Sequence, residues 1–90
     1  MSPYVASVRA QEDYFRLDIV FESGEHRIFD VQSYLNRGVF VRLQNPATFA
    51  AARVVAGSVE WPGGLDLSCD TLYLESAPAT EVDAVALAFA

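Results

Sequence analysis

The sequence predicts an α+β fold: a small β-rich domain of two antiparallel hairpins with short helices. Three observations lead to this prediction. Apolar and polar residues alternate between Tyr14 and Glu22, as in a half-buried strand. Gly24 and Gly57 supply turns between neighbouring apolar runs. Short strands and short helices interleave without long crossover helices, and 90 residues suffice for only one domain.

The first hairpin follows from the strongest strand pattern in the chain. Residues 4–9 are predicted to form a first strand. Residues 14–22 form the next, with Phe15, Leu17, Ile19 and Phe21 on one face. Ser23 and Gly24 then supply a turn, and residues 25–31 return as the partner strand.

Two registers are possible for this hairpin. A two-residue loop sets Phe21 opposite His26 and Ile19 opposite Ile28, so that the apolar faces match. A three-residue loop sets Ile19 opposite Arg27 instead. Because directly opposed residues share a face of the sheet, the two-residue loop is expected.

The middle of the chain is predicted to hold a short helical turn and a crossing segment. Asp30 or Ser33 can cap a turn through residues 34–35, which Gly38 ends. Residues 39–43 are compatible with either a strand or an extended crossing segment.

A helix is predicted to begin at Asn45 and Pro46. Asparagine is a favoured N-cap, and proline fits the first helical position, where a missing N–H does no harm. We expect this helix to run through Phe49 to about Ala52.

The second hairpin is predicted over residues 53–61, with its turn at Gly57 and Ser58. This pairing places Val54 and Trp61 on one face of the sheet. The opposite face carries Arg53, Val55 and Glu60. We expect Trp61 to fill the core, the alternative being that it anchors an interface.

The last part of the domain is predicted to leave the sheet. Residues 62–64, Pro-Gly-Gly, are expected to break it. Asp70 is expected to cap a short helix over residues 71–75.

The C-terminal segment is predicted to lie outside the domain. Residues 77–79 resemble a hinge, and residues 81–90 place apolar side chains at helical spacing, although their alternation also permits a strand. We therefore expect one domain over residues 1–77 and an Ala-rich tail over residues 78–90.

Charge and composition exclude several classes of protein. Twelve carboxylates oppose six arginines, so the formal net charge is −6 and direct binding to nucleic acid is not expected. The single cysteine cannot form an internal disulfide, the N-terminus does not resemble a signal peptide, and no apolar run is long enough to cross a bilayer. A cytoplasmic protein without membrane contact is expected.

No group of residues forms a recognisable catalytic or metal-binding pattern. His26 has neither a nucleophile nor further ligands near it in sequence. Cys69 precedes a helix start, but the neighbouring Asp70 disfavours its thiolate. The run from Asp66 to Asp70 lacks the glycine and the closing glutamate of a calcium loop. We therefore predict a protein that is not an enzyme and has no metal or cofactor.

Apolar residues make up 52% of the chain, more than a domain of this size can readily bury. Some of them are therefore expected to stay exposed and to contact another protein, either a second copy or a partner. The tail is the segment most expected to dock. The candidate contact residues are Tyr34, Val39, Phe40, Val82, Val85 and Phe89.

An ordered set of motifs resembles a known family. Phe21 and Glu22 precede Ser23-Gly24-Glu25, and Phe29-Asp30-Val31 follow. Further along come Tyr34-Leu35, Gly38-Val39-Phe40, Leu43, Phe49, Trp61-Pro62-Gly63-Gly64-Leu65-Asp66-Leu67 and Leu72-Tyr73. Over residues 5 to 75 the chain resembles the bacterial domain of unknown function 2442 family. It departs at Gly63, where the family usually has Asn.

The resemblance implies a compact β-rich α+β fold, with short helices packed on one face of a curved sheet. It brings no established catalytic residues. It also implies a gene beside that of another small protein, in an arrangement like a toxin–antitoxin pair. Some relatives carry a C-terminal helix-turn-helix domain, which we do not expect here.

Two functions follow from this reasoning. The first is a non-enzymatic protein-interaction domain, the acidic antitoxin-like member of a two-protein operon, since an acidic surface suits a basic partner. The alternative is a small-ligand-binding or regulatory domain without a DNA-binding companion.

Overall fold

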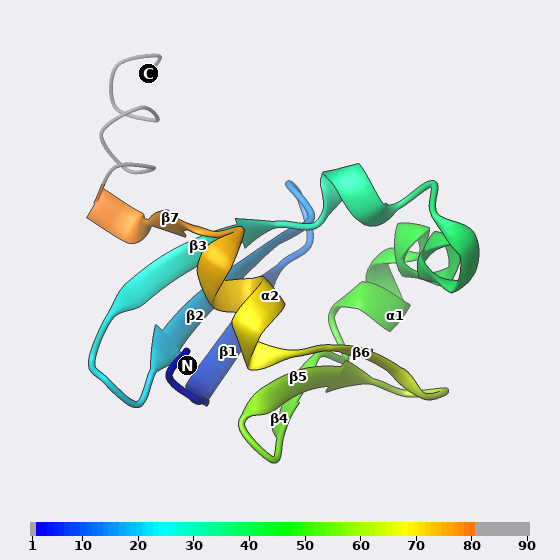
Figure 1. Ribbon diagram of the computed structural model, residues 1–90. Helices are drawn as coiled ribbons and strands as arrows, with labels where there is room; N and C mark the ends of the chain where they lie inside the picture. The colour runs from blue at the N-terminus through cyan, green and yellow to red at the C-terminus, as the bar shows by residue number, and fades with distance from the viewer. Residues whose placement is uncertain (1, 81–90) are drawn as a thin grey trace.

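The structure is a computed structural model that describes residues 2–80. Its elements are β1 (Val5–Gln11), β2 (Arg16–Phe21), β3 (His26–Asp30), the 3-10 helices η1 (Gln32–Tyr34) and η2 (Gly38–Gln44), α1 (Pro46–Phe49), β4 (Arg53–Val55), β5 (Ser58–Trp61), β6 (Leu65–Leu67), α2 (Cys69–Leu74) and β7 (Ala77–Pro78). They form two antiparallel sheets with short helices, so the predicted α+β class is confirmed (Figure 1).

The first sheet has the strand order β1-β2-β3-β7, and the second has the order β4-β5-β6. The two sheets lie at an angle to each other with α2 between them (Figure 1). The beginning of β1 joins them, because the Val5 N–H donates to the carbonyl of Gly57 at 2.8 Å.

The predicted register of the first hairpin is wrong. Ile19 lies opposite Arg27, which is the register of the three-residue loop. Gly24 has φ +91°, and its N–H donates to the Phe21 carbonyl at 2.9 Å, so a glycine in the left-handed region closes the longer loop. Arg27 is tolerated opposite Ile19 because its guanidinium turns aside and donates to the Oγ of Ser76 at 2.7 Å.

The second hairpin turns one residue earlier than predicted, at Ala56 and Gly57. Both have positive φ, +51° and +80°, as a two-residue type I′ turn requires. The predicted faces are nevertheless confirmed, because Val54 pairs with Val59 and so shares its face with Trp61.

Two strands were absent from the sequence prediction. Residues 62–64 do not break the sheet but connect β5 to β6, with Trp61 opposite Leu65. Residues 77–78 do not form a hinge but pair as β7 with the edge of β3. A proline fits this position at the edge of the described sheet, where none of the described strands requires its missing N–H.

The helix predictions agree with the structure at the start of α1 and differ from it at α2, η2 and η1. Asn45 caps α1 through its side chain, as predicted. At α2 the N-cap is Ser68 and not Asp70, so the helix begins two residues earlier. Residues 38–44 form η2, so neither a strand nor an extended segment is correct there. At η1 no side chain caps the N-terminus, although Asp30 accepts a hydrogen bond from the Gln32 N–H at 2.9 Å.

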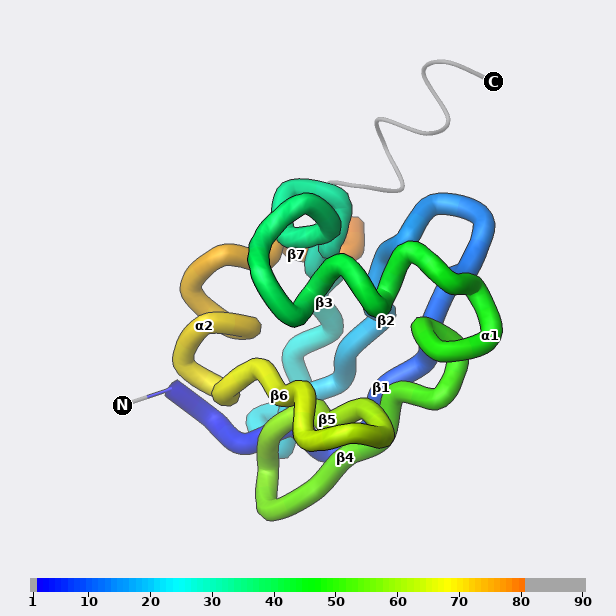
Figure 2. Tube along the Cα trace, turned by 90° about the vertical axis from the view of Figure 1, so that its right-hand side faces the viewer, coloured from blue at the N-terminus to red at the C-terminus, as the bar shows by residue number. Residues whose placement is uncertain are grey.

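The core lies between the inner faces of the two sheets and the helices that close the gap. The predicted core position of Trp61 is confirmed: the side chain is 1% exposed, stacks on Phe49 and donates from Nε1 to the Phe49 carbonyl at 3.0 Å. Leu43 of η2 and Leu72 of α2 are fully buried in the same core. In Figure 2, η2 and α1 face the viewer and β7 lies behind.

Candidate interaction surface

The segment over residues 38–44 holds exposed apolar side chains at the surface. Val39 is 59% exposed and Val41 is 46% exposed. A 3-10 helix has three residues per turn, so Phe40 and Leu43 share its inward side. Leu43 is buried and Phe40 packs against the core. We call the outward side, formed by Val39, Val41 and their neighbours Arg37 and Arg42, the η2 surface.

Two side chains at the C-terminal end of this segment hold it in place. Gln44 donates from Nε2 to the Leu35 carbonyl at 2.7 Å, and Arg42 donates from Nη2 to the Gly63 carbonyl at 3.3 Å. A Cβ on Gly63 would lie 2.7 Å from Nη1 of Arg42, so this glycine leaves room for the guanidinium. The exposed valines therefore project from a segment that the rest of the domain positions.

Tyr34 lies behind the η2 surface and is not part of it. Its ring packs on Phe29 and Phe40, with centroids 5.7 and 5.5 Å away, and the Arg37 guanidinium lies over it. Its hydroxyl donates to Oε1 of Glu75 at 2.6 Å. The structure thus brings the candidate residues Tyr34, Val39 and Phe40 together but leaves Val39 as the exposed one.

The other three candidate contact residues, Val82, Val85 and Phe89, lie outside the described residues. Their role in a contact stays a prediction.

A second tyrosine, Tyr73 of α2, repeats the arrangement of Tyr34. The Tyr73 hydroxyl donates to both carboxylate oxygens of Glu25, at 2.8 and 3.0 Å, and the Arg27 guanidinium lies over its ring. In both cases the hydrogen bond to the glutamate raises the pKa of the phenol above its usual 10.0, with burial and the carboxylate charge acting in the same direction.

These raised pKa values predict a loss of stability in alkali. A phenol whose folded-state pKa is raised stabilises the fold below the unfolded pKa, and the contribution disappears as the pH rises through the folded pKa. We therefore expect the stability advantage of the wild type over Tyr34→Phe/Tyr73→Phe to be constant below about pH 10, the pKa of an unfolded tyrosine, and to shrink as the pH rises above it through the raised folded-state pKa, as measured by urea denaturation. An advantage that stays constant as the pH rises through this region would contradict the assignment.

The charges around the η2 surface differ from those of the whole chain. Residues 31–59 contain Arg37, Arg42 and Arg53 and no carboxylate, although the chain has a net charge of −6. Among residues 2–80, neither Arg37 nor Arg42 forms an ion pair. Sequence reasoning missed this feature, although the gap between Asp30 and Glu60 in the printed sequence could have revealed it.

The residues considered for catalysis lie apart. His26 begins β3 and contacts Asp18 through Nε2, on the face of the sheet away from the core. Cys69 begins α2, and its N–H donates to Oγ of Ser58 at 3.1 Å. Within residues 2–80 no three His, Cys, Asp or Glu side chains are grouped so that they could hold a metal ion. No helix in this described range has the length and apolarity to span a bilayer.

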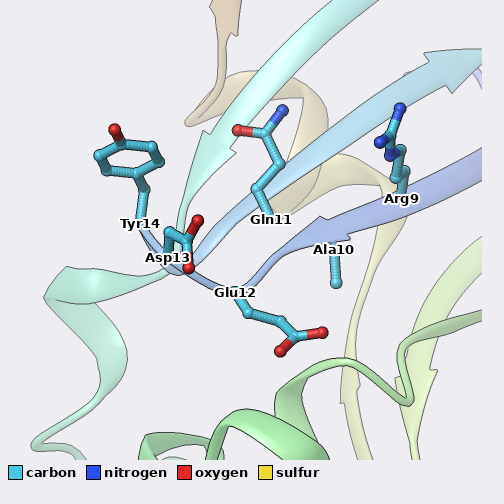
Figure 3. A pocket seen from close by; sticks show the side chains of 6 residues that line it. All are labelled: Arg9, Ala10, Gln11, Glu12, Asp13 and Tyr14. Carbon is cyan, nitrogen blue, oxygen red and sulfur yellow. The ribbon is translucent and has the colours of Figure 1, made fainter.

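A hollow of about 310 Å³ lies where β1 ends, lined by residues 9–14. Figure 3 shows that its side chains do not converge: Arg9, Gln11 and Tyr14 point to one side, and Ala10 and Glu12 point to the other. Ligand sites usually combine an apolar lining with a few convergent polar groups. This hollow therefore offers little support for the alternative of a small-ligand-binding domain.

A protein-family model matches most of the chain. Residues 5–78 match the family described as "Protein of unknown function (DUF2442)". The chain belongs to this family. No curated protein and no solved structure gives a significant match.

The DUF2442 region coincides with the described sheets, since it begins at the first residue of β1 and ends at the last residue of β7. Most of the aromatic and aliphatic motif residues that suggested the family are buried in the core: Phe21, Phe29, Val31, Leu43, Phe49, Trp61, Leu65, Leu67 and Leu72. Tyr34, Leu35, Phe40 and Tyr73 are partly buried against it, and Val39 is exposed. The fold of this DUF2442 protein therefore explains most of its motif residues.

Proposed function

We propose that this DUF2442 protein is a non-enzymatic protein-interaction domain that contacts its partner through the η2 surface. The observation that carries the proposal is the outward position of Val39 and Val41 on a segment anchored by Leu43, Gln44 and Arg42. Covering each half-exposed valine is favourable by on the order of 1 kcal/mol before association costs are subtracted. Because the segment is already positioned, little ordering is required on binding.

We further propose that it acts as the acidic, antitoxin-like member of a two-protein bacterial operon, in the cytoplasm. The net charge of −6 and the single cysteine support this. The carboxylates of residues 2–80 all lie outside residues 31–59. The surface that carries them would attract a basic partner, and the η2 surface would add apolar contact.

The proposal predicts which substitutions abolish partner binding. In affinity purification from the native host, Val39→Ser/Val41→Ser is expected to lose the co-purifying protein while its stability stays within about 1 kcal/mol of the wild type. The matched control is Val20→Ser/Val55→Ser, which changes two other exposed valines away from η2. Equal partner recovery with both variants, or loss with the control alone, would contradict the proposal.

A further inference from the structure

Residues 81–90 of the same chain have charges opposite to those of the η2 surface and apolar residues that could pack on its valines. The surface combines Val39 and Val41 with Arg37 and Arg42, in a stretch of 29 residues without any carboxylate, 31–59. Residues 81–90 have the opposite character: they contain Glu81 and Asp83, no basic residue, and an apolar remainder.

Apolar residues in this terminal segment recur at a spacing suited to one side of a helix, at Val82, Val85 and Phe89. The two carboxylates stand beside the first of them in sequence. An apolar stripe with acidic residues at one end matches a surface of two valines flanked by two arginines.

The direction of the chain favours a contact between two molecules. Figure 1 places β7 and the end of the described chain on the side of the molecule away from residues 38–44. Figure 2, which views the molecule from the side of residues 38–44, agrees, since β7 lies behind. The polypeptide therefore leaves the described part on the side remote from its own η2 surface.

We infer that residues 81–90 of one copy dock on the η2 surface of a second copy, Glu81 and Asp83 pairing with Arg37 and Arg42. This inference rests on the proposed role of the η2 surface and names a second copy as an occupant. In a two-fold symmetric pair each copy supplies one segment and receives the other, so the same contact forms twice.

Charge reversal in the full-length chain tests the inference. Light scattering over a wide dilution series is expected to give the mass of two chains for the wild type. Arg37→Glu/Arg42→Glu and Glu81→Arg/Asp83→Arg are each expected to give the mass of one chain. An equimolar mixture of these two variants is expected to regain the mass of two chains, because each segment then meets an opposite charge on the other copy.

Circular dichroism is used to check that each variant is folded. Arg53→Glu/Arg16→Glu is a control with the same change of charge at other positions, and it is expected to keep the mass of two chains. A wild type with the mass of one chain, or reversed variants that do not recombine on mixing, would overturn the inference. A third outcome separates the inference from the proposed function. If the wild type has the mass of one chain, and Val39→Ser/Val41→Ser loses a co-purifying protein other than this chain, the inference is overturned and the proposed function stays intact.

Discussion

Replacing Trp61 by alanine is expected to lower the free energy of unfolding by about 3–5 kcal/mol. The indole is 1% exposed, stacks on Phe49 and donates to the Phe49 carbonyl, so its removal leaves a cavity and takes away one of the two hydrogen bonds that this carbonyl accepts. A domain of this size has a total stability of about 5–15 kcal/mol, and the variant is therefore expected to be largely unfolded in mild denaturant. Urea denaturation followed by circular dichroism measures the change.

Two controls separate the parts of this effect. Trp61→Phe keeps most of the ring volume and loses the hydrogen bond, so a smaller loss is expected, on the order of 1–2 kcal/mol. Tyr14→Ala removes an exposed aromatic ring and is expected to cost little. If Trp61→Ala kept wild-type stability, the assignment of this side chain to the core would be wrong.

Replacing Leu43 by alanine is expected to cost about 2–5 kcal/mol, the second largest effect. Leu43 is fully buried and, with the partly buried Phe40, attaches η2 to the core. The variant is also expected to weaken partner binding in affinity purification, even under conditions where it stays folded, because Val39 and Val41 then lose their positioned segment.

Val39→Ala and Val41→Ala provide the comparison, since they shorten exposed side chains on the same segment. Each is expected to change stability by about 0.5 kcal/mol or less in urea denaturation. A Leu43→Ala variant as stable as these two would show that η2 is not held by the core.

The sequence predicted the parts of the fold that local patterns determine. The alternation between Tyr14 and Glu22 identified β2, and Asn45 before Pro46 identified the start of α1. Trp61 was placed in the core because its apolar neighbours share a face with it. These signals depend on residues close together in the chain.

The parts that were missed depend on contacts distant in sequence. Residues 38–44 form a 3-10 helix because Phe40 and Leu43 both reach the core, and a run of apolar residues does not distinguish this spacing from that of a strand. The register of the first hairpin followed from the conformation of Gly24 and not from the match of Ile19 with Ile28. β7 exists because β3 offers it an edge.

The candidate surface was predicted only in part, because it also depends on contacts that are distant in sequence. Val39, Phe40 and Tyr34 were selected as apolar residues in a segment of uncertain structure. The sequence did not show that Tyr34 is tied to Glu75, 41 residues away, and lies behind the surface. The sequence did contain the run of 29 residues without a carboxylate, 31–59. Its importance became clear only from the structure, in which Arg37 and Arg42 lie beside the exposed valines.

The most direct test of the central claim, that the η2 surface contacts a protein, is site-specific photocrosslinking in the native host. A photoreactive amino acid is placed at position 39 and, in a separate variant, at position 55, where an exposed valine lies on β4. The account predicts a discrete crosslinked species from position 39, containing a second copy or another small protein, and none from position 55. The same species from both positions, or none from position 39, would contradict it.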